Sequence, residues 1–191
     1  MQLHDCKSAI RFLRNRAGTF NIDSKRFAVM GDSAGGHLAS MVGLTNNNSK
    51  FEGSVGDMNG SSAVQAVINW FGPAEPLTMD QQSIGKELGS KDAPDSAESR
   101  LVGGTLQDSK AAAIAASPMT YVNAMAPPFL IQHGIIDRLV SYKQSENLAA
   151  ALRDAGCDVT LNLIEGAEHC FWGVNGMPIV QEVVSFLKAK L

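Results

Sequence analysis

Four short apolar runs along the chain predict buried β-strands. Each is rich in aliphatic or aromatic residues, and most are bounded by Gly or Pro, as is typical of strands covered on both faces. The runs are RFAVMG at 26–31, AVQAVINWFG at 63–72, PPFLIQHG at 127–134 and VTLNLIEG at 159–166.

Helical patterns lie before, between and after these runs. The first is an amphipathic helix that we expect to end at Gly18, with apolar residues at helical spacing and basic residues mostly on the other side. The apolar positions are Leu3, Cys6, Ile10 and Leu13, and the basic positions are Lys7, Arg11, Arg14 and Arg16. Further helices are expected over 34–44, 142–155 and 178–190.

The alternation of strand and helix predicts an α/β fold with right-handed crossovers, that is, a mostly parallel sheet flanked by helices. We expect a single domain over 1–191.

Two segments interrupt the alternation. Residues 46–62 are polar and rich in glycine, which predicts a long surface loop. Residues 73–126 are longer than a connection needs and predict a lid-like helical insertion, with short helices within 97–104 and 108–118, that helps to shape the binding site.

The most informative motif is GDSAG at 31–35, which matches the GxSxG pattern between an apolar strand and a helix. In that setting the serine of such a motif lies on a tight turn that exposes its hydroxyl above the sheet edge. Ser33 is therefore the candidate nucleophile, and the backbone N–H of Ala34, at the start of a helix, is a candidate donor to an oxyanion. A phosphate-binding turn fits poorly, because the glycines do not have GxGxxG or GxxxxGK spacing.

A serine nucleophile needs a base and an acid that orients the base. In α/β folds with a GxSxG turn between strand and helix, the three residues follow along the chain in the order serine, acid, histidine. Asp137 follows the third predicted strand and His169 follows the fourth. Parallel strands carry their sites at their carboxyl ends, so these side chains are expected to meet Ser33. His133, at the end of a strand, is the alternative base, whereas His37 and His4 lie on predicted helices and are expected to be packing or surface residues.

Composition excludes several classes of partner. The formal net charge is −3 and the pI is about 5.8, so neither nucleic acid nor an anionic membrane is expected to bind. The three cysteines are not spaced as metal ligands, and no run approaches the length of a membrane span. We expect a cytoplasmic protein that needs no metal or other cofactor and acts on a small-molecule substrate.

The blocks GDSAGGHLA, PPFLIQHGIIDRLVSYKQSENLAAAL and EGAEHCF resemble those of the α/β-hydrolase superfamily, specifically its small esterase/lipase-like group with acetyl-esterase and feruloyl-esterase-type enzymes. The resemblance implies a serine carboxylic-ester hydrolase that acts on small or short-chain acyl esters. Ser33 would be the nucleophile, Asp137 the acid, His169 the base and Ala34 one oxyanion donor. Trp70, Phe71, Phe171 and Trp172 lie near strand ends and are candidates to line the substrate site.

The sequence departs from that family before the serine. Members carry further strands and an HGGG-type loop there, which supplies a second oxyanion donor, whereas Gly18 is the only glycine before Gly31. We expect a truncated α/β-hydrolase fold with the first strand at an exposed edge, association into a homo-oligomer and reduced activity. Two alternatives remain: a serine peptidase or acylaminoacyl hydrolase, because the same triad cleaves amides, and a non-catalytic remnant that associates through its sheet edge.

Overall fold

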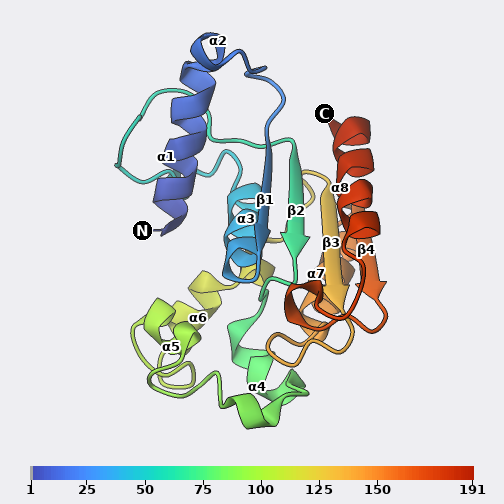
Figure 1. Ribbon diagram of the computed structural model, residues 1–191. Coiled ribbons are helices and arrows are strands. Elements are labelled where there is room, and N and C mark those ends of the chain that lie inside the picture. Colours follow the sequence, from blue (N-terminus) through green and yellow to red (C-terminus); the bar gives the residue numbers. More distant parts are fainter. Residues whose placement is uncertain (1) are drawn as a thin grey trace.

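The four apolar runs form one parallel sheet in the order β1-β2-β3-β4, in a computed structural model that describes residues 2–191 (Figure 1). The strands are β1 (Ala28–Asp32), β2 (Ala66–Trp70), β3 (Phe129–Gly134) and β4 (Val159–Ile164). All three pairings are parallel. The prediction of an α/β fold with a parallel sheet is therefore confirmed.

Helices cover both faces of this sheet. α3 (Ala34–Leu44) and α7 (Lys143–Asp154) pack on one face, and α8 (Met177–Lys190) packs on the other. Because successive side chains of a strand point to opposite faces, β2 and β3 contribute to two separate cores. Val67, Phe129 and Ile131 pack toward α3 and α7, whereas Ala66, Ile68 and Leu130 pack toward α8.

The insertion lies beyond the carboxyl ends of the strands (Figure 1). It contains three short helices, α4 (Met79–Gln82), α5 (Ala97–Val102) and α6 (Lys110–Ala116), together with 3₁₀ turns at Pro76–Thr78, Lys86–Leu88 and Pro118–Tyr121. Its start is held by Gln144 of α7, whose Oε1 accepts the N–H groups of Ala74 at 2.9 Å and Glu75 at 2.7 Å. The insertion is thereby fixed over the edge at which the site was predicted.

The prediction that the first helix ends at Gly18 was wrong. α1 (Gln2–Asn15) ends before Gly18, and a separate short helix, α2 (Ala17–Phe20), follows. Lys7 and Arg11 are fully buried, because Glu52 of the 46–62 segment folds over them. The Glu52 carboxylate pairs with Lys7 Nζ at 3.0 Å and with Arg11 Nη1 at 2.5 Å. The predicted surface loop at 46–62 is thus a strap over α1, and its single Glu52 carboxylate pairs with both buried basic side chains.

β1 forms one edge of the sheet and pairs only with β2, as the sequence predicted. Met30 in this strand is 46% exposed, so apolar surface is present at the edge. Association into an oligomer through this edge stays a prediction. Within residues 2–191, no helix combines the length and the apolar character that crossing a membrane requires.

Candidate active site

Ser33 lies on a strained turn between β1 and α3. Its φ of 50° and ψ of −119° fall outside the ordinary regions for a non-glycine residue. The turn is held because the Ser33 N–H donates to the Trp70 carbonyl at 2.8 Å and the Ser33 carbonyl accepts the His37 N–H at 3.0 Å. A Cβ on Gly31 would collide with the Gly35 carbonyl, so the backbone crosses itself here as closely as the GxSxG pattern predicted.

A buried asparagine, Asn69, links the turn to β2. Asn69 of β2 donates from Nδ2 to Ser40 Oγ at 2.8 Å, and its Oδ1 accepts the Gly72 N–H at 2.8 Å. A Cβ on Gly36 would lie 2.6 Å from the same Oδ1. Asn69 therefore connects the end of β2 to the first turns of α3, a role that the sequence analysis missed because a single asparagine within an apolar run carries no distinctive signal.

The structure brings Ser33, His169 and Asp137 together in one hydrogen-bonded chain. His169 Nε2 lies 3.1 Å from Ser33 Oγ, and His169 Nδ1 lies 2.7 Å from Asp137 Oδ2. His169 begins a 3₁₀ turn, His169–Phe171, just after β4, and Asp137 lies in the turn after β3. The three residues are far apart in sequence and meet at the carboxyl edge of the sheet.

The Asp137 carboxylate is buried but well supplied with donors. Its Oδ1 accepts the backbone N–H groups of Leu139 and Val140, each at 2.9 Å. Burial raises the pKa of Asp137, but hydrogen bonds from His133, His169 and the Val140 N–H outweigh that effect and lower it to about 2. The group is therefore ionised at neutral pH and able to orient a histidine.

His133 was the alternative base, and its contacts differ from those of His169. Its Nε2 lies 3.2 Å from Asp137 Oδ2 and 2.8 Å from the Val140 carbonyl, and its Nδ1 lies 2.7 Å from Ser145 Oγ. Neither of its nitrogens contacts Ser33. The four-residue spacing between His133, near the end of β3, and Asp137, in the turn that follows, is the signal that would have suggested this contact.

The four candidate aromatic residues lie in different environments. Phe71, Trp70 and Phe171 form a packed cluster, with ring centroids 4.8 Å apart for Phe71 and Phe171 and 5.2 Å apart for Trp70 and Phe171. Phe71 also packs edge-on against the His169 ring at 4.7 Å, and Trp70 Nε1 donates to Gln132 Oε1 at 2.6 Å. Trp172 is 75% exposed and lies beside His169. Of the four, Trp172 is the one placed at the surface of the site.

Two hollows lie at the site, and Ser33 lines the first of them. One, of about 480 Å³, is lined by Ser33 and Ala34 together with residues of the insertion and of the turn after Asp137. The other, of about 530 Å³, is lined by His169, Cys170 and Trp172 with neighbouring residues. The candidate oxyanion donor Ala34 begins α3, where backbone N–H groups lack intrahelical partners. Across residues 2–191, no group of three or more His, Cys, Asp or Glu side chains is arranged to hold a metal ion.

Comparison with known families identifies the chain. The BD-FAE family model matches residues 1–152, a span that includes both Ser33 and Asp137. The chain belongs to the BD-FAE family. A curated relative of this BD-FAE chain is esterase LipQ of Mycobacterium tuberculosis, 32% identical over 168 residues, which cover 87% of this chain and 38% of LipQ. Esterase LipC of the same organism is 29% identical over 187 residues, which cover 96% of this chain and 45% of LipC. The chain thus spans less than half the length of these relatives.

Solved structures of esterases share the fold of this BD-FAE chain. A truncated form of a carbohydrate esterase from gut microbiota superposes with a TM-score of 0.87 at 28% identity and covers 99% of this chain and 68% of its own. The propionate-bound esterase Est2 of Thermogutta terrifontis superposes with a TM-score of 0.68 at 27% identity, covering 98% of this chain and 62% of its own. The sheet and its flanking helices therefore have an α/β-hydrolase fold.

Proposed function

We propose that this protein is a serine carboxylic-ester hydrolase that acts on small or short-chain acyl esters. The observation that carries the proposal is the continuous hydrogen-bonded chain from Ser33 through His169 to the ionised Asp137. The esterase names of its curated relatives and structural neighbours support the same reaction class.

The first half-reaction transfers the acyl group to the serine. Ser33 Oγ attacks the ester carbonyl carbon while His169 Nε2 takes its proton, and Asp137 holds the ring through Nδ1. The tetrahedral intermediate then collapses: the bond to the alcohol oxygen breaks, and the alcohol leaves with the proton held by His169. The product is an ester between Ser33 and the acyl group.

The second half-reaction returns the enzyme to its starting state. A water molecule gives one proton to His169 Nε2 as its oxygen attacks the acyl carbon. The bond to Ser33 Oγ breaks, the proton returns to the serine, and the carboxylic acid is released. In both halves the negative charge forms on the substrate carbonyl oxygen, and we expect the N–H of Ala34, at the start of α3, to donate to it.

Labelling with a fluorophosphonate tests the nucleophile directly. We expect the wild-type protein to be labelled and Ser33→Ala to be unlabelled, whereas Ser185→Ala, which alters an exposed serine of α8, keeps the label. Hydrolysis of a short-chain nitrophenyl ester and of the matched anilide would then separate esterase from amidase action. An unlabelled wild-type protein that hydrolyses neither substrate would contradict the proposal.

A further inference from the structure

The hollow lined by Ser33 and the hollow lined by His169 serve different parts of an ester in the proposed reaction. The histidine of a serine hydrolase gives its proton to the leaving group, so the alcohol lies on the side of His169 and Trp172. The acyl group is then left to the other hollow, which is lined by Ser33 and Ala34. This assignment rests on the proposed function.

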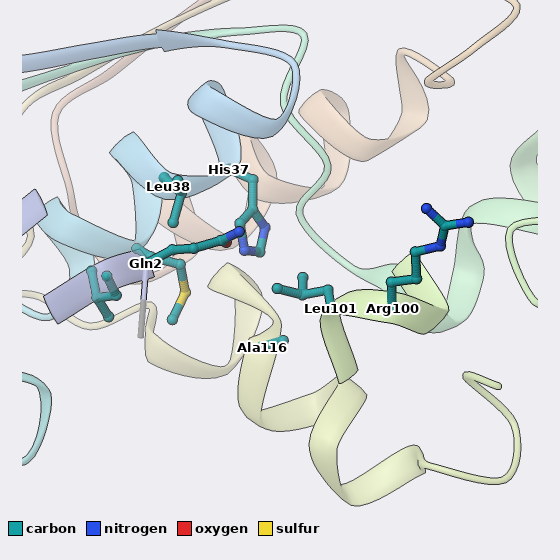
Figure 2. Close-up of a pocket in the computed structure, with 8 residues that line it drawn as sticks. Gln2, His37, Leu38, Arg100, Leu101 and Ala116 are labelled. Carbon is teal, nitrogen blue, oxygen red and sulfur yellow. The ribbon is translucent and has the colours of Figure 1, made fainter. Parts of the chain in front are cut away.

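The hollow on the acyl side continues away from Ser33. A smaller hollow of about 190 Å³ shares Ala34, Pro73, Ala97 and Glu98 with it. That smaller hollow in turn shares Gln2, His37 and Leu101 with a third, of about 350 Å³, which Figure 2 shows between α3, α5 and the start of α1. The three hollows adjoin through these shared residues, and we call them together the acyl groove, which extends from Ser33 past His37 to Leu101 and Ala116.

His37 supplies the one buried polar side chain of the far part of this groove. It is 8% exposed, and its ring projects from α3 into the space beside Gln2 and Leu101 (Figure 2). Its Nδ1 lies 3.3 Å from the Pro73 carbonyl, which can only accept, so Nδ1 carries the proton. Burial lowers the pKa of His37 despite this carbonyl, so the ring is neutral at pH 7. Its Nε2 is then an acceptor that has no hydrogen-bond partner among residues 2–191.

Water can reach His37 Nε2 from the groove, because Ser99 Oγ is the one fully buried side-chain nitrogen or oxygen without a hydrogen-bond partner among the described residues. A plain hydrocarbon chain that displaced this water would leave the acceptor unpaired, which is costly, whereas a chain with a hydroxyl group at this point would pair with it. The other residues of the far part include Leu3, Leu38 and Met41, which suit a hydrocarbon chain. We propose that the acyl groove binds an acyl chain with a hydroxyl group, and that this hydroxyl donates to His37 Nε2. His37 is then a specificity-determining residue, and esters of hydroxy acids are the preferred substrates.

Matched substrates test the proposal. We would measure kcat/KM for methyl esters of straight-chain acids of increasing length, each with and without a terminal hydroxyl group, and for methyl acetate. At the chain length that reaches His37 we expect the hydroxylated ester to be preferred by roughly 2- to 12-fold, the effect of one net hydrogen bond. In His37→Phe this preference should fall to a ratio of about one. His37→Gln restores an acceptor and should keep part of the preference. The control variant His4→Phe, on α1, should keep the full preference.

A second variant tests the path of the chain. Leu101→Trp narrows the far part of the groove, so it should lower kcat/KM for the longer acids relative to methyl acetate. Two results together would overturn the acyl groove: the esters are hydrolysed with no preference for a hydroxyl group at any length, and Leu101→Trp has the same chain-length profile as the wild type. Because the esters are still hydrolysed, these results would leave the proposed function intact.

Binding to the Ser33→Ala protein separates the two proposals if no ester is hydrolysed. The hydroxylated methyl ester should shift the ¹⁵N resonance of His37 Nε2, and the plain ester of the same length should shift it less. Such a shift without hydrolysis by the wild-type protein would support the groove and contradict the proposed function. Equal shifts, or none, with both esters would overturn the groove.

Discussion

His133 Nε2 lies 3.2 Å from Asp137 Oδ2, and both side chains are fully buried. The same oxygen accepts from Nδ1 of His169, while Oδ1 accepts two backbone N–H groups. Both carboxylate oxygens are therefore held, and the carboxylate cannot rotate without breaking hydrogen bonds. This arrangement fixes the direction from which Asp137 meets His169.

The first prediction concerns the protonation of Asp137. Its pKa is lowered to about 2 in the folded protein, below its ordinary value. The ionised Asp137 should therefore contribute its full stabilisation at any pH above the ordinary pKa of an aspartate. This contribution should be lost as the pH falls through about 2. A ¹³C NMR titration of the Asp137 carboxyl should have its midpoint near pH 2.

In His133→Phe, which removes one donor, the midpoint should rise, whereas Ser145→Ala leaves the Nε2 donor in place and should change it less. An unchanged midpoint in His133→Phe would show that the donors from His169 and the backbone suffice.

The second prediction concerns the role of Asp137 in the proposed reaction. Asp137→Asn keeps the size of the side chain but no longer stabilises the positively charged ring or its correct tautomer. We expect kcat for a short-chain ester to fall by roughly 10³–10⁴-fold while the protein remains folded. Asp154→Asn, at the exposed end of α7, is the matched control and should have wild-type kcat. A loss of less than about tenfold in Asp137→Asn would argue against a triad.

The third prediction concerns the crowding beneath the Ser33 turn. Gly36→Ala places a Cβ 2.6 Å from Asn69 Oδ1 and 2.8 Å from the Trp70 carbonyl. Because one of these is backbone, β2 and α3 must separate, and we expect a loss of about 1–3 kcal/mol in the free energy of unfolding. Gly18→Ala is the control, because a Cβ there meets nothing within 4 Å inside α2, and it should be neutral or slightly stabilising. Urea denaturation measures both, and equal stability of the two variants would refute the argument.

The fourth prediction concerns the strap over α1. Glu52→Gln leaves the buried Lys7 and Arg11 without the carboxylate that they share, so we expect a loss of about 1.5–3 kcal/mol in the free energy of unfolding. Glu146→Gln removes the exposed pair with Lys143 and should change stability little. Destabilisation of similar size in the two variants would mean that the buried position of the Glu52 pairs adds nothing.

The sequence by itself determined the strand and helix order and the chain order of the site residues. The four strands are short apolar runs and α3 begins directly after Ser33, so local pattern was sufficient. The GxSxG pattern around Ser33 predicted the tight turn, and at Gly31 the reason is steric, because a Cβ there would collide with the Gly35 backbone. Asp137 and His169 were found because parallel strands bring their carboxyl ends to one edge, although their catalytic roles stay predictions.

Only the tertiary structure decided which polar side chains meet. In sequence, Lys7 and Arg11 are a basic helix face typical of the surface, and they are buried because Glu52, far along the chain, supplies the opposite charge. His133 and His169 are alternatives in sequence, and the distances to Ser33 and Asp137 separate them. His37 Nε2 faces a hollow between α3 and the insertion, and no local sequence pattern predicts that position. Local sequence sets backbone conformation, whereas partners distant in the chain set the contacts and burial of each charged group.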